Sequence, residues 1–210
     1  MTEDLREPFQ YFVGLAQELG RRYRTINDLF FGPPEVLAAM KSTAPGFFRE
    51  LLDVYREAIL FGMARLVDPE KDRKGKPNLS VRRFIAELDR RGMANEEMRS
   101  RAKAMETITK NKSLADFRNR WLAHSDENSA IEQESFEIPD WADVKQFLDD
   151  LDALTREIGN ALGINVTRAL SARKTPLHAK HFTEYLIRAS SQPIEPSAFT
   201  KMTETRTNGR

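Results

Sequence analysis

Apolar residues recur along most of this chain at the three-to-four-residue spacing of an amphipathic helix, and no stretch sustains the alternation of a strand. The first such pattern runs from Phe9 to Ile26, and a Gly-Pro-Pro run at residues 32–34 interrupts it. Proline is tolerated in the first turn of a helix, so a short second helix is expected to start there and to include Met40. Further helical patterns cover residues 47–67, 81–91, 95–110, 114–124, 141–162 and a short stretch from 177. The sequence therefore predicts an all-α fold.

The most apolar of these predicted helices extends from Phe47 to about Val67. Two neighbouring apolar stripes run along it, one at positions 48, 52, 55 and 59 and the other at positions 47, 51, 54, 58 and 61. A helix with two adjoining stripes presents a wide apolar face. We therefore expect this helix to lie at the centre of the core, with both stripes buried.

Helix-start signals accompany two of the later helices. Ser80 precedes one apolar run, and Leu79 and Phe84 occupy the positions of a hydrophobic staple around it. Asp140 precedes the last long helix, whose apolar residues repeat at near-heptad spacing, a pattern typical of bundle packing. The charged residues 68–77, with their turn-forming Gly and Pro, predict an exposed loop.

The helical patterns divide the chain unequally. Residues 1–165 are expected to form the bundle, and residues 166–189 a short helical extension. Residues 190–210 are rich in Ser, Thr, Pro and Asn and contain few large apolar groups, a composition that predicts a disordered, flexible tail.

Composition excludes several classes of protein. The absence of Cys removes disulfides, thiolate zinc sites and thiol catalysis, and it fits a reducing compartment. The start of the chain has no signal-peptide pattern, and no apolar run approaches the length needed to cross a bilayer. We expect a soluble, cytoplasmic protein with no membrane contact. His178 and His181 stand three residues apart without an obvious neighbouring carboxylate, so no metal and no cofactor is expected.

The net charge of +1 conceals an uneven distribution. Residues 65–124 carry 16 Lys and Arg against 9 Asp and Glu, whereas residues 125–165 carry 2 against 11. A basic block suits a phosphate-bearing partner. The other interpretation is that the basic and acidic blocks pair with each other within the chain or across a dimer.

The most unusual chemistry lies in the basic block, between Leu114 and Asp126. On a helical wheel, Leu114, Phe117 and Trp121 form one apolar stripe, with Arg118 on one flank and His124 on the other, about 9 Å apart along the axis. A charged side chain on the inward half of a helix needs a partner. The inward position of Arg118 has two explanations. Either Arg118 forms a structural salt bridge while His124 interacts with the dipole at the helix C-terminus, or the two residues belong to a functional site.

An Arg followed by a polar residue, and by a His after five intervening residues, resembles the signature of the HEPN domain superfamily. The blocks Phe61 to Pro69, Asn78 to Arg83 and Ala123 to Asp126 extend the resemblance to the branch associated with U-type abortive-infection systems of bacteria (AbiU-like). The similarity covers roughly residues 5–165. It implies an up-and-down helical bundle with short extra helices, a homodimer, and in many members a metal-independent ribonuclease whose Arg and His face a cleft between protomers.

On this resemblance, the chain is expected to be an endoribonuclease acting in phage defence, abortive infection or a toxin–antitoxin pair. His124 would act as general acid or base when a ribose 2′-OH attacks phosphorus, and Arg118 would bind the phosphate oxygens. Asn119 would contact the ribose or orient His124; the alternative is that it is exposed and takes no part in the reaction. Arg120 is a rival phosphate ligand whose outward position favours a surface role. A homodimer with both Arg118/His124 helices facing one cleft would supply a second His.

The predicted RNA-binding residues outside the motif are the cations of the 68–77 loop, Lys71, Arg73, Lys74 and Lys76. The alternative function is a catalytically silent HEPN module that binds RNA, a nucleotide or a protein partner. Asp126 stands two residues after His124, where one toxin subgroup has Tyr, and this difference weakens the expectation of a paired antitoxin.

Overall fold

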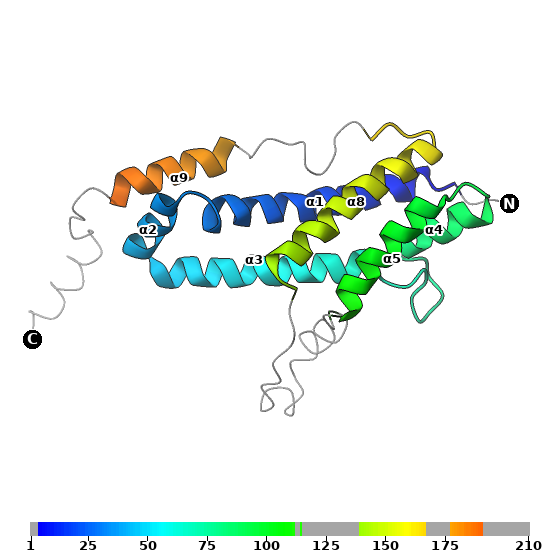
Figure 1. Ribbon diagram of the computed structural model, residues 1–210, viewed down its shortest axis with the longest axis horizontal. Helices are drawn as coiled ribbons and strands as arrows, with labels where there is room; N and C mark the ends of the chain where they lie inside the picture. Colours follow the sequence, from blue (N-terminus) through cyan, green and yellow to red (C-terminus); the bar gives the residue numbers. More distant parts are fainter. Residues whose placement is uncertain (1–3, 112–113, 115–138, 167–176, 191–210) are drawn as a thin grey trace, which may run out of the picture.

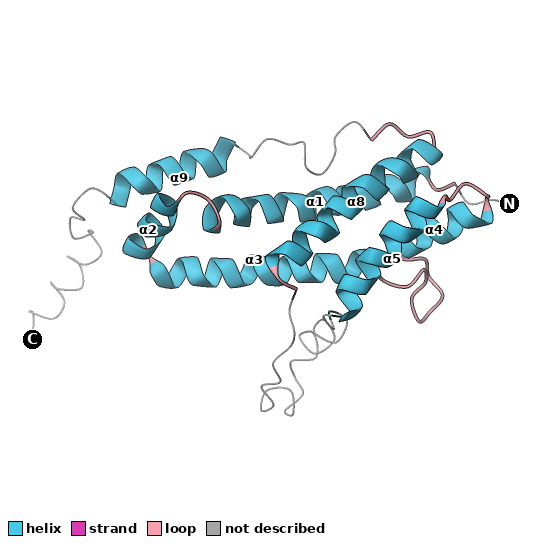
Figure 2. Ribbon diagram, viewed as in Figure 1, coloured by secondary structure: helices cyan, strands magenta, loops and turns pink. Residues whose placement is uncertain are grey.

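The computed structural model describes residues 4–111, 114, 139–166 and 177–190. Helices and their connecting loops make up this part of the chain, which contains no strand apart from one isolated bridge between Lys71 and Pro77 (Figure 2). The predicted all-α helical bundle is confirmed. The helices are α1 (Arg6–Phe30), α2 (Pro34–Thr43), α3 (Pro45–Leu66), α4 (Val81–Arg90), α5 (Glu96–Asn111), α8 (Trp141–Ala161) and α9 (Leu177–Ser190).

Two long helices, α1 and α3, form the base of the bundle (Figure 1). They lie side by side and run in opposite directions, because the short helix α2 reverses the chain between them. Helix α8 crosses this pair and packs along α5, and α4 lies beside α5 at the same end. Helix α9 packs against α2 at the opposite end.

The main hydrophobic core joins α1, α3, α4, α5 and α8. At its centre the ring of Phe84, on α4, meets the rings of Phe9 and Phe12, on α1, at centroid distances of 5.4 Å and 5.1 Å. All three side chains are fully buried. These contacts fix the position of α4, a helix of ten residues that is too short to be stable alone.

Both predicted helix caps are present. The Ser80 hydroxyl accepts a hydrogen bond from the backbone N–H of Arg83 at 3.4 Å. Asp140 accepts one from the N–H of Asp143 at 2.8 Å, and the Asp143 carboxylate accepts one in return from the N–H of Asp140 at 3.2 Å. This reciprocal capping box satisfies N–H groups that the first turn of α8 would otherwise leave unpaired.

The expectation that both stripes of α3 are buried is wrong for the N-terminal half of the helix. Phe48 and Ile59, on the first stripe, are 5% and 1% exposed, whereas Phe47 and Val54, on the second, are 59% and 54% exposed. Leu51, also on the second stripe, is partly buried against the cluster that α3 forms with α2 and α9, so the exposed positions there are those of Phe47 and Val54. Apolar periodicity shows which faces can be buried, and the neighbouring helices decide which of them are.

The region expected to be a short helical extension contains α9. Leu186, which is 5% exposed, joins a second, smaller cluster with Val36, Ala39, Met40 and Phe48. The division of the chain at residues 165 and 190 stays a prediction. Ser190, the first residue of the predicted tail, ends α9, and residues 191–210 lie outside the described residues. Within the described part, none of the helices is long and apolar enough to cross a membrane.

Candidate functional site

The four cations predicted to bind RNA lie together in the loop between α3 and α4. Asp72 organises this loop, because its Oδ1 accepts hydrogen bonds from the backbone N–H groups of Lys74 and Lys76, each at 2.8 Å. The Asp72 N–H donates to the carbonyl of Lys76 at 2.8 Å, and Gly75 takes the positive φ of 78° that the turn requires. The loop is therefore a closed hairpin that holds its backbone in place.

The cationic side chains of this hairpin all point to solvent. Lys71, Arg73, Lys74 and Lys76 are exposed, and none of them forms an ion pair with another described residue. The only anion among residues 71–76 is Asp72, which is occupied by the backbone. A fixed backbone that carries four exposed cations can contact phosphates without a large ordering cost.

Other cations of the basic block are already paired. Arg101, on α5, reaches across to α8, where its Nη1 lies 3.2 Å from Asp150 and its Nε lies 3.3 Å from Glu157. The hydrogen bond that Arg101 donates to the Glu97 carboxylate raises the pKa of Arg101 more than burial lowers it, so its pKa lies above the ordinary value. Arg82, on α4, pairs with Glu106, on α5, at 2.8 Å. The basic and acidic blocks therefore pair between α5 and α8, whereas the hairpin cations pair with none of the acidic residues in the described part of the chain.

The base of the hairpin is tied to the core through Arg83. This residue is only 4% exposed, and its Nη1 donates to the carbonyl of Asn78 at 3.5 Å while its guanidinium lies 5.8 Å from the ring of Phe84. Sequence analysis did not single out Arg83 as a buried cation. The helical periodicity gives no sign of its burial, because on the wheel Arg83 lies nearly opposite the apolar residues Val81, Phe84, Ile85 and Leu88.

Arg118, Asn119, Arg120 and His124 lie outside the described residues, so their geometry stays a prediction. The segment that carries them is attached to the bundle at both ends. At the first, Leu114 is 1% exposed and belongs to the main core. At the other, Trp141 stacks on Tyr23 and on Phe31 at centroid distances of 4.8 Å and 5.0 Å, and its Nε1 donates to Asn27 at 3.4 Å.

The described residues contain no group of three His, Cys, Asp or Glu side chains that could hold a metal ion. His181 is exposed, and its Nδ1 lies 3.9 Å from Glu184. The side chain of His178 lies outside the described residues.

Comparison with known families identifies the chain. The family model HEPN_AbiU2, described as AbiU2, matches residues 10–182, which is more than half of the chain. This span includes the hairpin, the motif segment and part of α9. No curated protein matches the chain, and no solved structure matches it. The all-α bundle and this match agree, and the chain belongs to the AbiU2 family of HEPN domains.

Proposed function

We propose that this protein is a metal-independent endoribonuclease that acts in bacterial phage defence, either in abortive infection or in a toxin–antitoxin context. The observation that carries the proposal is the family match, because it spans the segment that contains Arg118 and His124. The described residues that flank this segment support it, since Leu114 and Trp141 both pack against the helical bundle.

In the proposed reaction, a base removes the proton of a ribose 2′-OH, whose oxygen then attacks the adjacent phosphorus. The 5′ oxygen leaves with a proton, and the product ends in a 2′,3′-cyclic phosphate. His124 transfers a proton in this step, because an imidazole with a pKa near 6.5 can act in either direction at neutral pH. Arg118 neutralises the charge that develops on the phosphorane oxygens. Asn119 contacts the ribose or orients His124.

The protein acts in this proposal as a cytoplasmic homodimer that brings two copies of the motif to one cleft. Each copy then supplies one His, so that one imidazole can act as base and the other as acid. The exposed hairpin guides RNA toward the cleft through its cations, and Arg120 is a further phosphate contact. A defence partner or an antitoxin would control when RNA is cut.

The test is cleavage of total cellular RNA by the purified protein. His124→Ala should lose on the order of 100-fold or more in rate while RNA still binds, and Arg118→Lys should lose activity because the bidentate fork is absent. His181→Ala is the matched control, since this exposed His lies on α9, outside the motif segment. EDTA should have no effect, and DNA should not be cut because it lacks the 2′-OH. Full activity in folded His124→Ala would refute the mechanism.

The contribution of the hairpin is measured separately. Replacing Lys71, Arg73, Lys74 and Lys76 with Gln should weaken RNA binding and reduce the salt dependence by about 0.7 per lost contact with a single strand. The control replaces four exposed cations elsewhere with Gln, namely Lys41, Arg49, Arg56 and Lys103. An equal loss of RNA affinity in both variants would show that the hairpin contributes only through the overall positive charge of the protein.

Asp126 favours a second candidate function. A carboxylate two residues after His124 repels the phosphate that a cleavage site must hold, which disfavours cutting and leaves a module that binds a protein partner, or that binds RNA or a nucleotide without cutting it. RNA binding without cleavage of any RNA, in a folded dimer, would support this candidate over the enzyme.

A further inference from the structure

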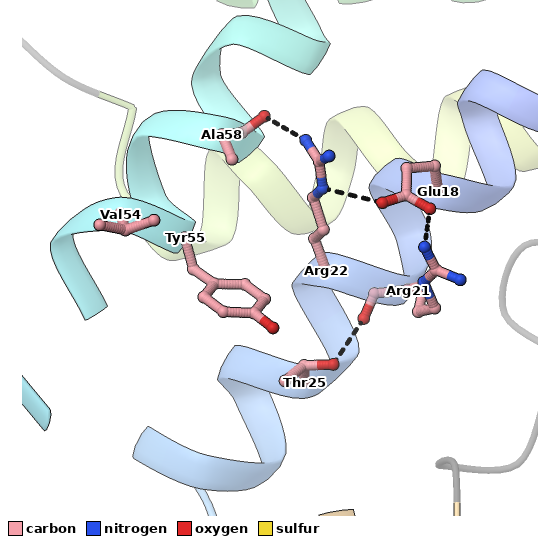
Figure 3. Close-up of a pocket in the computed structure, with 7 residues that line it drawn as sticks. All are labelled: Glu18, Arg21, Arg22, Thr25, Val54, Tyr55 and Ala58. Carbon is pink, nitrogen blue, oxygen red and sulfur yellow. Dashed lines mark hydrogen bonds and ion pairs between the residues drawn. The ribbon is translucent and has the colours of Figure 1, made fainter. Parts of the chain in front are cut away.

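A groove between α1 and α3 lies outside the motif and the hairpin (Figure 3). Its volume is about 490 Å³. Its walls are formed by Glu18, Arg21, Arg22 and Thr25 of α1 and by Val54, Tyr55 and Ala58 of α3. The wall on α1 is mainly charged and the wall on α3 is mainly apolar, so an occupant has to present groups of both kinds.

The apolar wall is part of a longer row of side chains on α3. The members of this row are alternately four and three positions apart, namely Phe47, Leu51, Val54, Ala58 and Phe61. Alternation of four and three is the spacing of the contact row between two helices that pack along their length. Phe47 and Val54 are 59% and 54% exposed, so the bundle leaves two members of this row uncovered. A further helix can pack there.

Helix α1 carries a second row with the same spacing. Its members are Tyr11, Leu15, Glu18, Arg22 and Thr25. The Tyr11 side chain is 64% exposed, and the other four are partly exposed. Two rows with this spacing, on neighbouring helices and beside one groove, form a seat for a third helix.

The hydrogen bond from Arg22 Nη1 to the carbonyl of Ala58, at 3.4 Å, shows how the two rows lie against each other. Tyr11 precedes Arg22 by eleven residues, and Phe47 precedes Ala58 by eleven residues. Because α1 and α3 run in opposite directions, the two exposed aromatic side chains lie at opposite ends of the groove, each about 16 Å along the axis from this bond. The surface is therefore about 30 Å long, the length of a helix of about 20 residues.

The charge in the groove selects an acidic occupant. Arg22 Nε donates to Glu18 at 3.1 Å, and Arg21 also pairs with Glu18, so the three charged side chains leave a net charge of +1. Figure 3 shows the Arg22 guanidinium between Glu18 and Ala58. Its Nη2 group forms no hydrogen bond with another residue in the described part of the chain. A guanidinium held by two bonds, with one donor group left, suits a carboxylate.

We propose that this surface binds an amphipathic helix of a partner protein, with apolar side chains on Val54 and Ala58 and an Asp or Glu on Arg22. A small molecule would fill the groove and leave Tyr11 and Phe47 uncovered, whereas a helix covers the whole surface. The inference goes beyond the proposed cleavage reaction, because binding here requires neither Arg118 nor His124.

The probe is a synthetic helical peptide of three heptads, with Leu at positions a and d and Glu at positions e and g. A second peptide carries Gln in place of each Glu. Each is labelled with a fluorophore, kept below the concentration at which it self-associates, and titrated with the full-length protein by fluorescence anisotropy. The wild type should bind the Glu peptide about tenfold more tightly than the Gln peptide, because the carboxylate forms a charge-assisted hydrogen bond.

Two variants test the two walls of the groove. Arg22→Gln should bind the Glu peptide and the Gln peptide with nearly equal affinity, since the cation that distinguishes them is absent. Val54→Glu should weaken both peptides about tenfold or more, because it places a carboxylate where an apolar side chain packs. Neither position is buried, and circular dichroism should show unchanged helix content in both variants.

Two control variants carry the same changes of charge at exposed positions elsewhere. Arg56→Gln is on α3, about 200° around the helix from Val54, and Ser100→Glu is on α5. Both should bind the two peptides as the wild type does. An equal loss of affinity in these controls would overturn the inference, because overall charge would then explain the binding.

The inference is also overturned if the wild type binds neither peptide, or if Arg22→Gln and Val54→Glu leave both affinities unchanged. Sedimentation tests the other occupant, a second copy of this chain. Val54→Glu should keep the oligomeric state of the wild type, and dissociation of a wild-type dimer by this change would assign the surface to contact between copies instead. RNA cleavage is measured apart from peptide binding, so the failure of either proposal leaves the other standing.

Discussion

Truncating Phe84 should destabilise the protein far more than truncating Phe47, although the sequence predicts that both rings are buried. Phe84 is fully buried and meets the rings of Phe9 and Phe12 at 5.4 Å and 5.1 Å. A buried Phe removes about 200 Å² from water, which corresponds to about 5 kcal/mol at about 25 cal/mol per Å². Because Ala keeps part of this area and the cavity adds a cost, Phe84→Ala should lower the free energy of unfolding by about 3–5 kcal/mol.

The same scale gives a small effect at Phe47. Its side chain is 59% exposed, so its burial contributes about 2 kcal/mol at most, and a surface position leaves no enclosed cavity. For a chain of this length, each kcal/mol of lost stability lowers Tm by about 2–4 °C. Tm should therefore fall by about 6–20 °C in Phe84→Ala and by only a few degrees in Phe47→Ala.

The measurement is urea unfolding of the full-length chain followed by circular dichroism, with the slope m compared between variants. Thermal scans at two protein concentrations accompany it. Equal losses for Phe84→Ala and Phe47→Ala would refute the assignment of the exposed stripe. A loss at Phe47 that grows with protein concentration would place that stripe in an interface between copies.

Three further outcomes are expected. Burial raises the pKa of Tyr23 above its ordinary value, so its hydroxyl stays protonated in the folded state at a pH where it ionises in the unfolded chain. The stability that this shift contributes is complete below about pH 10 and is lost as the pH rises through the pKa of Tyr23 in the folded state. Tyr23→Phe should remove this pH-dependent loss of stability. Absorbance titration of the variant should show one fewer late-ionising tyrosine among the four of the chain. Arg101→Met should cost about 1.5–3 kcal/mol in urea unfolding, because it leaves the carboxylates of Asp150 and Glu157 without their shared cation, and Asp150→Asn in the same chain should recover part of that cost. Deleting residues 191–210 should leave Tm almost unchanged, since their composition offers few apolar groups to bury, and a drop of several degrees would contradict this expectation.

The sequence alone determined where the described helices lie and where most of them begin. Apolar spacing is a local property, and caps such as Ser80 and Asp140 act within one turn, so both can be recognised without knowing the neighbours. The blocks of residues that resemble HEPN domains were also visible in the sequence, and the family match confirmed them. The hairpin cations were found in the same way, because four of them stand within six residues.

Only the tertiary structure decided which surfaces meet. Arg101 and Asp150 are 49 residues apart, and Tyr23 and Trp141 are separated by most of the chain, so no local pattern pairs them. Likewise, both stripes of α3 are apolar in the sequence, but Phe48 is buried because residues of α2 and α9 pack against it, whereas Val54 on the other stripe is 54% exposed. Burial depends on what packs against a face, and the packing partners come from helices distant in the sequence.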